Sequence, residues 1–152
     1  MKTVIVYFSK HHGNTKKLAE AIAEKYPVEL IDLAKQSGPD VSGYDRIGLA
    51  SGIYAGSFAK QIMRFVRDKL PSGKQVFLMS TSAGPKQSYE KSVRKLLEQK
   101  TDCTIIGSYM CEGFNTFGPT KLFGGTAKGH PTQEEIDDAV RFYGGLNNDK
   151  SV

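Results

Sequence analysis

Residues 3–22 read TVIVYFSKHHGNTKKLAEAI, and this stretch decides the class of fold. Its first part, Thr3 to Phe8, is an almost continuous apolar run rich in β-branched residues, which predicts a strand buried on both faces. Polar groups follow at once from Ser9 to Thr15, and apolar residues then recur at helical spacing. A strand, a short polar bend and a helix in this order are typical of an α/β protein with a parallel sheet.

The remainder of the chain repeats this alternation. Further apolar runs of strand length lie at 28–33, 46–50, 75–80 and 104–110, and helical spacing follows the third and fourth of the five predicted strands. A final helix is predicted after Pro131, where Thr132 and Glu135 form a capping box. The connection 34–44 holds a short helix or none. We therefore predict one domain over residues 1–152, a three-layer α/β/α sandwich around a five-stranded parallel sheet.

Composition limits the classes of protein to consider. With 39% hydrophobic and 24% charged residues, the sequence is typical of a globular domain, and it contains no apolar run long enough for a membrane helix. We expect a cytoplasmic protein, a monomer or weak dimer. The net charge of +5 reflects either solvated helix faces or an acidic partner or anionic substrate. Nucleic acid is not expected as a partner, because no stacking aromatics alternate with the basic residues.

The bend after the first strand has the chemistry of a phosphate-binding loop. Backbone amides near Gly13, Asn14 and Thr15 would point toward one spot at the start of a helix, where the helix dipole favours an anion. Ser9 adds a hydroxyl donor. The alternative is that Asn14 or Thr15 merely caps the helix.

Two more glycine-bearing loops follow predicted strands and so lie at the same sheet edge. The first, Ser51 to Ser57, places Tyr54 between glycines, either packed on the protein surface or facing a planar ligand. The second, Thr81 to Pro85, is small and polar and can supply amide donors to the edge of a ring. Neither loop contains Asp or Glu. The three loops together predict a pocket for a flat molecule with an anionic tail.

At these residues the sequence resembles the flavodoxins, in which a turn of the form [ST]xxxGNT holds the phosphate of FMN. The stretch YFSKHHGNTKKLAEAI matches that strand, loop and helix, while SGIYAGS and STSAG lie where the family contacts the flavin ring. The resemblance covers nearly the whole chain. It implies the strand order 2-1-3-4-5 and FMN as the cofactor.

The resemblance also implies roles for individual residues. Tyr54 would stack on the ring, and Gly56, or else Gly52, would be the glycine near flavin N5 whose peptide reorients on reduction. The implied FMN-binding set consists of Ser9, Lys10, His11, Gly13, Asn14 and Thr15 around the phosphate, and Ser51, Ile53, Tyr54, Ala55, Gly56, Thr81, Ser82, Ala83 and Gly84 around the ring.

Two features depart from the family pattern. Flavodoxins are usually strongly acidic, whereas this sequence has a pI near 9.1, and its third loop lacks the aromatic residue that often covers the second flavin face. The long segment 112–131 could supply that cover, because a connection of this length usually has a function. We expect Phe114 or Phe117 to lie near the flavin or a substrate and Lys121 to meet an anionic group. An Ω-type loop packed on its own aromatics is the alternative.

The resemblance favours an electron carrier between redox partner proteins over a self-sufficient enzyme. No catalytic residues and no metal ligands are predicted, because the three histidines form no recognisable nucleophilic or acid/base set. A small FMN-dependent NAD(P)H:quinone-type oxidoreductase and an accessory flavoprotein that activates a radical enzyme are the alternatives. A phosphoacceptor domain is excluded because FSK and ASG stand where that class needs acidic residues.

Overall fold

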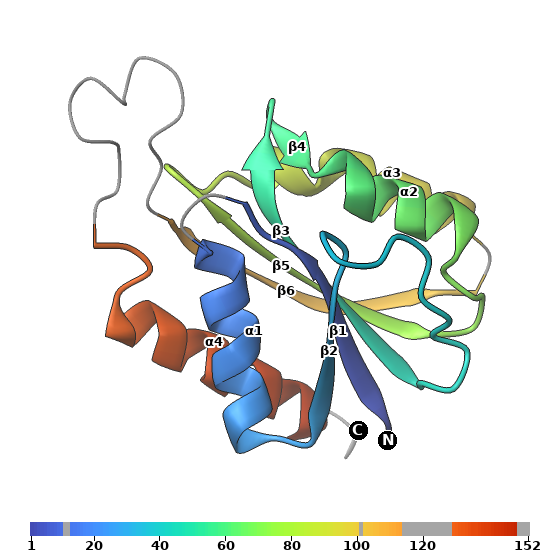
Figure 1. The fold of residues 1–152 in the computed structure, drawn as a ribbon, viewed down its shortest axis with the longest axis horizontal. Coiled ribbons are helices and arrows are strands. Elements are labelled where there is room, and N and C mark those ends of the chain that lie inside the picture. The colour runs from blue at the N-terminus through green and yellow to red at the C-terminus, as the bar shows by residue number, and fades with distance from the viewer. Residues whose placement is uncertain (11–12, 101, 114–128, 149–152) are drawn as a thin grey trace.

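The computed structural model describes residues 1–10, 13–100, 102–113 and 129–148, and the predicted architecture is confirmed. Five parallel strands form the sheet in the order β2-β1-β3-β5-β6, and a short sixth strand, β4, pairs antiparallel with β3 (Figure 1). The strands are β1 (Thr3–Phe8), β2 (Val28–Asp32), β3 (Arg46–Tyr54), β4 (Ser57–Phe58), β5 (Gln75–Ser82) and β6 (Thr104–Glu112). Because β4 is additional, the predicted fourth and fifth strands are β5 and β6.

Helices cover both faces of the sheet. One face carries α1 (Asn14–Lys25) and α4 (Gln133–Asn148), and the other carries α2 (Lys60–Asp68) and α3 (Lys91–Gln99), which the 3-10 turn η1 (Gln87–Glu90) precedes (Figure 1). The segment between β2 and β3 contains turns and no helix, which is the second of the two alternatives predicted for residues 34–44. Among the described helices, none is both long and apolar enough to cross a membrane.

Alternation along the central strand creates two cores. Val4, Val6 and Phe8 of β1 are buried beneath α2 and α3, whereas Ile5 and Tyr7 are buried beneath α1 and α4. Successive side chains of a strand point to opposite faces, so a strand covered on both sides reads as one continuous apolar run. This is why the sequence shows strands without polar alternation.

Three strands are longer than predicted. β3, β5 and β6 continue to Tyr54, Ser82 and Glu112, and Phe58, which is at helical spacing from Ile62 and Val66, lies on β4. The extra residues of β3, Ser51 to Tyr54, include a serine and a glycine, but they still form ladder pairs: Gly52 pairs with Thr81 of β5, and Tyr54 pairs with Ser57 of β4. Pairing with a neighbouring strand therefore outweighs the weak strand propensity of Gly52.

The edge of the sheet where β3 begins is held by a buried arginine. Arg46 is 1% exposed, and its guanidinium donates to Gln75 Oε1 at 3.2 Å and to Asn147 Oδ1 at 2.6 Å. It also lies 5.9 Å from the ring centre of Tyr143. A buried charge needs such partners, and they connect β3 with β5 and with the last turn of α4.

Candidate functional site

A cavity of about 310 Å³ opens at the carboxyl ends of the parallel strands. This edge, where β1, β3 and β5 end and the chain turns into loops or helices, is where α/β sheets bind their ligands. The lining consists of Ser9, Lys10, Asn14, Thr15, Gly52, Ile53, Tyr54, Ala55, Gly56, Thr81, Ser82, Ala83, Gly84, Tyr89 and Gly113.

The structure brings most of the predicted site residues together here. Of those that the structure describes, all but Gly13 and Ser51 line the cavity. Ser51 is fully buried: its hydroxyl donates to Gly52 O at 2.6 Å and accepts from the Ala59 amide at 2.9 Å, so it holds the strand end in place. His11, Phe114 and Phe117 lie outside the described residues.

The N-terminus of α1 faces the cavity without a protein anion of its own. Gly13 is the N-cap residue and adopts the left-handed conformation, with φ 65° and ψ 32°. Among the described residues, no side chain caps the helix, and its first turn contains no acidic residue. Asn14 and Thr15 are helical residues, so the alternative in which one of them is the cap is wrong. The exposed amides and the positive end of the helix dipole suit a phosphate.

Two threonine hydroxyls meet in the floor of the cavity. Thr15 is fully buried, and its Oγ1 lies 2.9 Å from Oγ1 of Thr81, at the end of β5. In such a pair one hydroxyl donates its proton and the other accepts it, so the accepting group keeps its own O–H for a third atom. The pair therefore ties α1 to β5 and offers one further donor to the cavity.

Tyr54 joins the hairpin to the phosphate loop. Its hydroxyl accepts a hydrogen bond from the Lys10 amide at 3.3 Å, and its ring packs edge-on against Phe8, with 6.1 Å between the centroids. The ring also passes over Gly52, where an added Cβ would lie 2.9 Å from the hydroxyl oxygen. Burial raises the pKa of Tyr54 and the Lys10 amide only partly opposes this, so the phenol is neutral at physiological pH.

A tight turn follows Tyr54. Ala55 and Gly56 have φ values of 51° and 76°, and the residues on either side of them pair as β3 and β4, so this is a two-residue hairpin of type I′ geometry. Ala55 is a non-glycine residue in the left-handed region, which costs about 1–2 kcal/mol. The predicted loop is thus a strained hairpin tip at the mouth of the cavity.

Two lining residues escaped the sequence prediction. Tyr89 is at helical spacing from Val93 and Leu97, but it lies on η1, half-buried against the cavity, and supplies a second aromatic ring. Gly113 follows β6, and an added Cβ there would lie 2.7 Å from Asn14 Nδ2 and 3.0 Å from Thr81 Cβ. Its amide donates to Ser82 O at 2.8 Å, so the chain passes close against the cavity floor.

The cavity is electrostatically biased toward anions. Lys10 is the one charged residue among those that line it, and no carboxylate is present in the described lining. A pocket of this size with two tyrosines, several hydroxyls and a helix N-terminus has the donors and flat surfaces that a planar molecule with an anionic group requires.

Comparison with known proteins identifies the family. Residues 4–109 match the flavodoxin domain family. The chain belongs to this family. It is also 38% identical over 144 residues to an uncharacterized protein of Methanocaldococcus jannaschii, a match that covers 93% of this chain and 95% of the relative.

Solved flavodoxins share the fold of this family member. Oxidised flavodoxin 1 of Bacillus cereus superimposes with a TM-score of 0.66 at 17% identity, covering 97% of this chain and 98% of the other. A flavoprotein of Lactobacillus acidophilus, solved in complex with FMN, gives a TM-score of 0.56 at 22% identity, covering 72% and 92% of the two chains. The predicted flavodoxin-like architecture is thereby confirmed.

Proposed function

We propose that the cavity binds FMN, with its phosphate at the N-terminus of α1 and its ring between the hairpin and the loop after β5. The observation that carries this proposal is the convergence of an uncapped helix N-terminus and two tyrosines on one cavity whose lining holds Lys10 and no acid. The solved complex of a family neighbour with FMN supports the same choice of cofactor.

The lining residues divide into two groups by their chemistry. Ser9, Lys10, Asn14 and Thr15 supply amides, a hydroxyl and a cation for the phosphate, whereas Tyr54 and Tyr89 supply flat apolar surface for the ring. Ser82, Ala83 and Gly84 leave backbone amides accessible beside the ring edge. FMN supplies the redox chemistry when bound, and the protein determines its position and the charges around it.

We further propose that the protein carries electrons between redox partners. The described lining contains no His, Asp, Glu or Cys, so it offers no general acid, base or nucleophile for a separate chemical step. Because the described lining contains no carboxylate, no lining residue repels negative charge on the flavin ring. We therefore expect a higher reduction potential than in a site lined by acidic residues.

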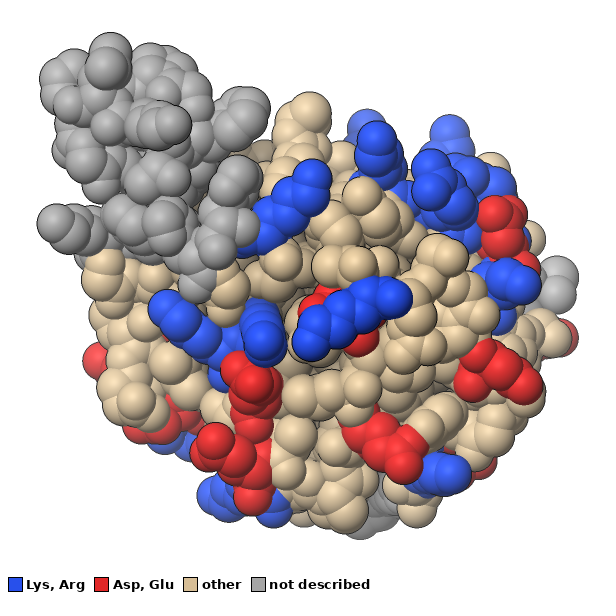
Figure 2. Space-filling model, viewed as in Figure 1, with Lys and Arg blue, Asp and Glu red and all other residues tan. Residues whose placement is uncertain are grey.

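The surface charge favours an acidic partner protein. Residues 60–100 contain ten Lys or Arg and three Asp or Glu, and Figure 2 shows the basic side chains gathered over α2 and α3. Within α4, by contrast, four acidic residues outnumber Arg141. Since complementary potentials steer association, a partner with an acidic face would approach the α2 and α3 side of the molecule.

The cofactor proposal is tested by mixing the FMN-free chain with FMN, desalting, and recording absorbance and flavin fluorescence. A bound, quenched flavin is expected, and riboflavin, which lacks the phosphate, should bind at least tenfold more weakly. Equal affinities for FMN and riboflavin would overturn the phosphate assignment, and a colourless desalted protein would overturn the proposal.

The carrier proposal needs a separate measurement. The FMN-loaded protein should oxidise NADPH or NADH at a negligible rate alone and should pass electrons once a flavoprotein reductase is added. Rapid turnover of NAD(P)H with a quinone, without any reductase, would instead establish the oxidoreductase alternative.

The proposed partner surface is tested with a pair of charge variants. Arg64→Glu should slow association with an acidic partner and reduce the salt dependence of the association rate. Glu20→Gln, on the opposite face, should leave the rate and its salt dependence unchanged.

A further inference from the structure

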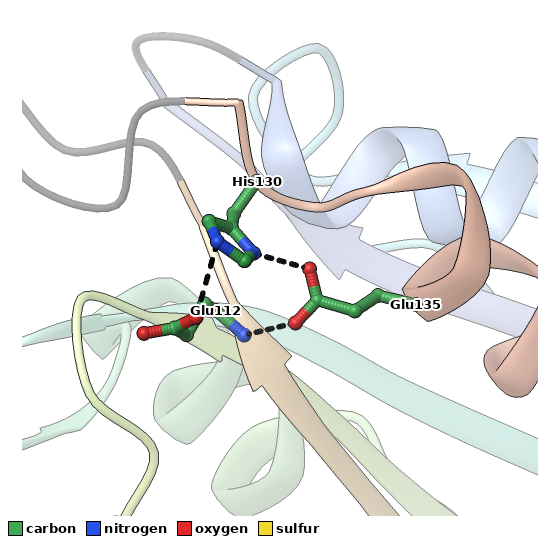
Figure 3. A group of neighbouring side chains, drawn as sticks. All are labelled: Glu112, His130 and Glu135. Carbon is green, nitrogen blue, oxygen red and sulfur yellow. Dashed lines mark hydrogen bonds and ion pairs between the residues drawn. The ribbon is translucent and has the colours of Figure 1, made fainter.

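Glu112, His130 and Glu135 form a cluster beside the cofactor cavity (Figure 3). Glu112 is the last residue of β6, Glu135 lies in the first turn of α4, and His130 precedes that helix. The histidine ring lies between the two carboxylates: Nδ1 is 2.5 Å from Glu135 Oε1, and Nε2 is 3.2 Å from Glu112 Oε2. The three side chains therefore join the end of β6 to the start of α4.

Hydrogen bonds to Glu135 hold this arrangement together. Its Oε1 accepts from the Thr132 amide at 2.8 Å and its Oε2 accepts from the Glu112 amide at 3.3 Å. With these partners, the Glu135 carboxylate accepts the Nδ1 proton of His130 and fixes the orientation of the ring.

This arrangement requires a cation between the remaining pair of atoms. With the Nδ1 proton donated to Glu135, a neutral imidazole presents the lone pair of Nε2 toward Glu112 Oε2, only 3.2 Å away. Two acceptors facing each other at that distance repel. Either a proton or a metal ion must lie between them.

We propose that this position binds a divalent transition-metal ion, with Zn²⁺ as the best match. Zn²⁺ binds imidazole nitrogen and carboxylate oxygen at about 2.0 Å, and two ligands of a tetrahedral ion then lie about 3.3 Å apart. His130 Nε2 and Glu112 Oε2 already have nearly this separation. Glu135 acts as the outer carboxylate that orients a metal-binding histidine through its other nitrogen.

The site is accessible and adjoins the cofactor cavity. The side chains of His130 and Glu112 are 28% and 39% exposed, which leaves room for an ion to enter and for water to complete its coordination. Glu112 directly precedes Gly113 of the cavity lining. A bound ion would link β6 to α4 and place positive charge next to the cavity wall. The inference does not depend on the identity of the cofactor.

The test is calorimetric titration of Zn²⁺ into tag-free, chelator-treated full-length protein. A background of His11→Ala with His12→Ala leaves His130 as the only imidazole, because the chain contains three histidines. One Zn²⁺ per chain is expected. Glu112→Gln and His130→Gln should each weaken binding at least about tenfold, as should Glu135→Gln by freeing the ring. The matched control Glu134→Gln, on the same helix outside the cluster, should bind as the background protein does.

Two calorimetric results would overturn the site. One is the absence of saturable Zn²⁺ binding below about 1 mM, and the other is equal affinity in Glu112→Gln and Glu134→Gln. Nitrogen NMR of His130 in the folded background protein, where it is the single imidazole, measures whether Nε2 carries a proton. If Nε2 carries a proton at neutral pH and does not respond to Zn²⁺, the cluster is an ion pair and the proposal fails.

Discussion

The hydroxyl of Tyr54 accepts a hydrogen bond from the backbone amide of Lys10 at 3.3 Å. Tyr54 comes from the hairpin at the end of β3, and Lys10 belongs to the loop that enters α1, so one bond connects the two walls of the cavity. The same amide is among the donors assigned to the phosphate of FMN. Ligand binding and this internal bond therefore compete for one N–H group.

This competition gives opposite expectations for two substitutions of Tyr54. Tyr54→Phe keeps the ring and removes the competing acceptor, so FMN should bind as tightly as in the native protein or up to about tenfold more tightly. Tyr54→Ala also removes the ring and should weaken binding by about tenfold or more. Fluorescence quenching of FMN measures both. Equal losses in the two variants would contradict the assigned roles.

The threonine pair in the cavity floor should contribute mainly to phosphate affinity. Thr15→Val keeps the shape of the buried side chain, removes its hydroxyl and leaves Thr81 without that partner. We expect FMN affinity to fall by about tenfold and riboflavin affinity to change much less. Thr81→Val provides the matched comparison across the same hydrogen bond. A similar loss for both ligands would indicate that the pair only supports the fold.

The hairpin tip stores strain that substitution should release. Ala55→Gly relieves a left-handed alanine and should raise the free energy of unfolding by about 1 kcal/mol. Gly56→Val places a β-branched residue at φ 76° and should lower it by about 1–3 kcal/mol. Urea unfolding of the FMN-free protein measures both. No difference between the two variants would argue against the turn geometry.

Close packing at Gly113 should make it intolerant of a side chain. Gly113→Ala puts a methyl group 2.7 Å from Asn14 Nδ2 and 3.0 Å from Thr81 Cβ, so the Asn14 side chain must move. Because Asn14 and Thr81 both line the cavity, we expect weaker FMN binding and a stability loss of about 1–3 kcal/mol from this crowding. Gly84→Ala, also in the lining but with open space around it, should leave stability nearly unchanged. Unfolding and FMN titrations distinguish the two variants.

The capping box of α4 is predicted by the sequence and present in the structure. Glu135 N donates to Thr132 Oγ1 at 3.1 Å, and the Thr132 amide donates to Glu135 Oε1 at 2.8 Å. Thr132→Ala should lower the free energy of unfolding by about 1 kcal/mol, whereas Thr132→Ser should keep most of the stability that the cap contributes. Thermal unfolding measures the difference. Equal stability of the two variants would contradict the capping role.

The parallel strands and the sheet edge that carries the cavity could be predicted because each depends on local patterns, whereas the order of the strands followed from the resemblance to the flavodoxins. Buried runs such as Thr3–Phe8 mark the parallel strands, and the polar bend before Asn14 marks the ligand-binding edge. The strand ends were missed because small polar residues read as loops when their pairing partners are not visible. The turn at Ala55–Gly56 was missed because Ala-Gly is not a usual type I′ pair.

The remaining site residues depend on tertiary contacts that a linear sequence does not display. Tyr89 fits a helical stripe by its spacing, and only the η1 turn directs it to the cavity. Gly113 matters because Asn14 and Thr81 approach it from distant parts of the chain. The cluster around His130 likewise forms only when β6 and the start of α4 come together.

The buried Arg46 divides the molecule into a fixed end and an adaptable end. Its hydrogen bonds to Gln75 and Asn147 lock the starts of β3 and β5 to the last turn of α4, opposite the cavity. The cavity end is built instead from a hairpin tip, a 3-10 turn and single hydrogen bonds. Backbone amides should therefore exchange with solvent slowly around Arg46 and faster around Tyr54, and breathing of the sheet should begin at the edge that receives the ligand.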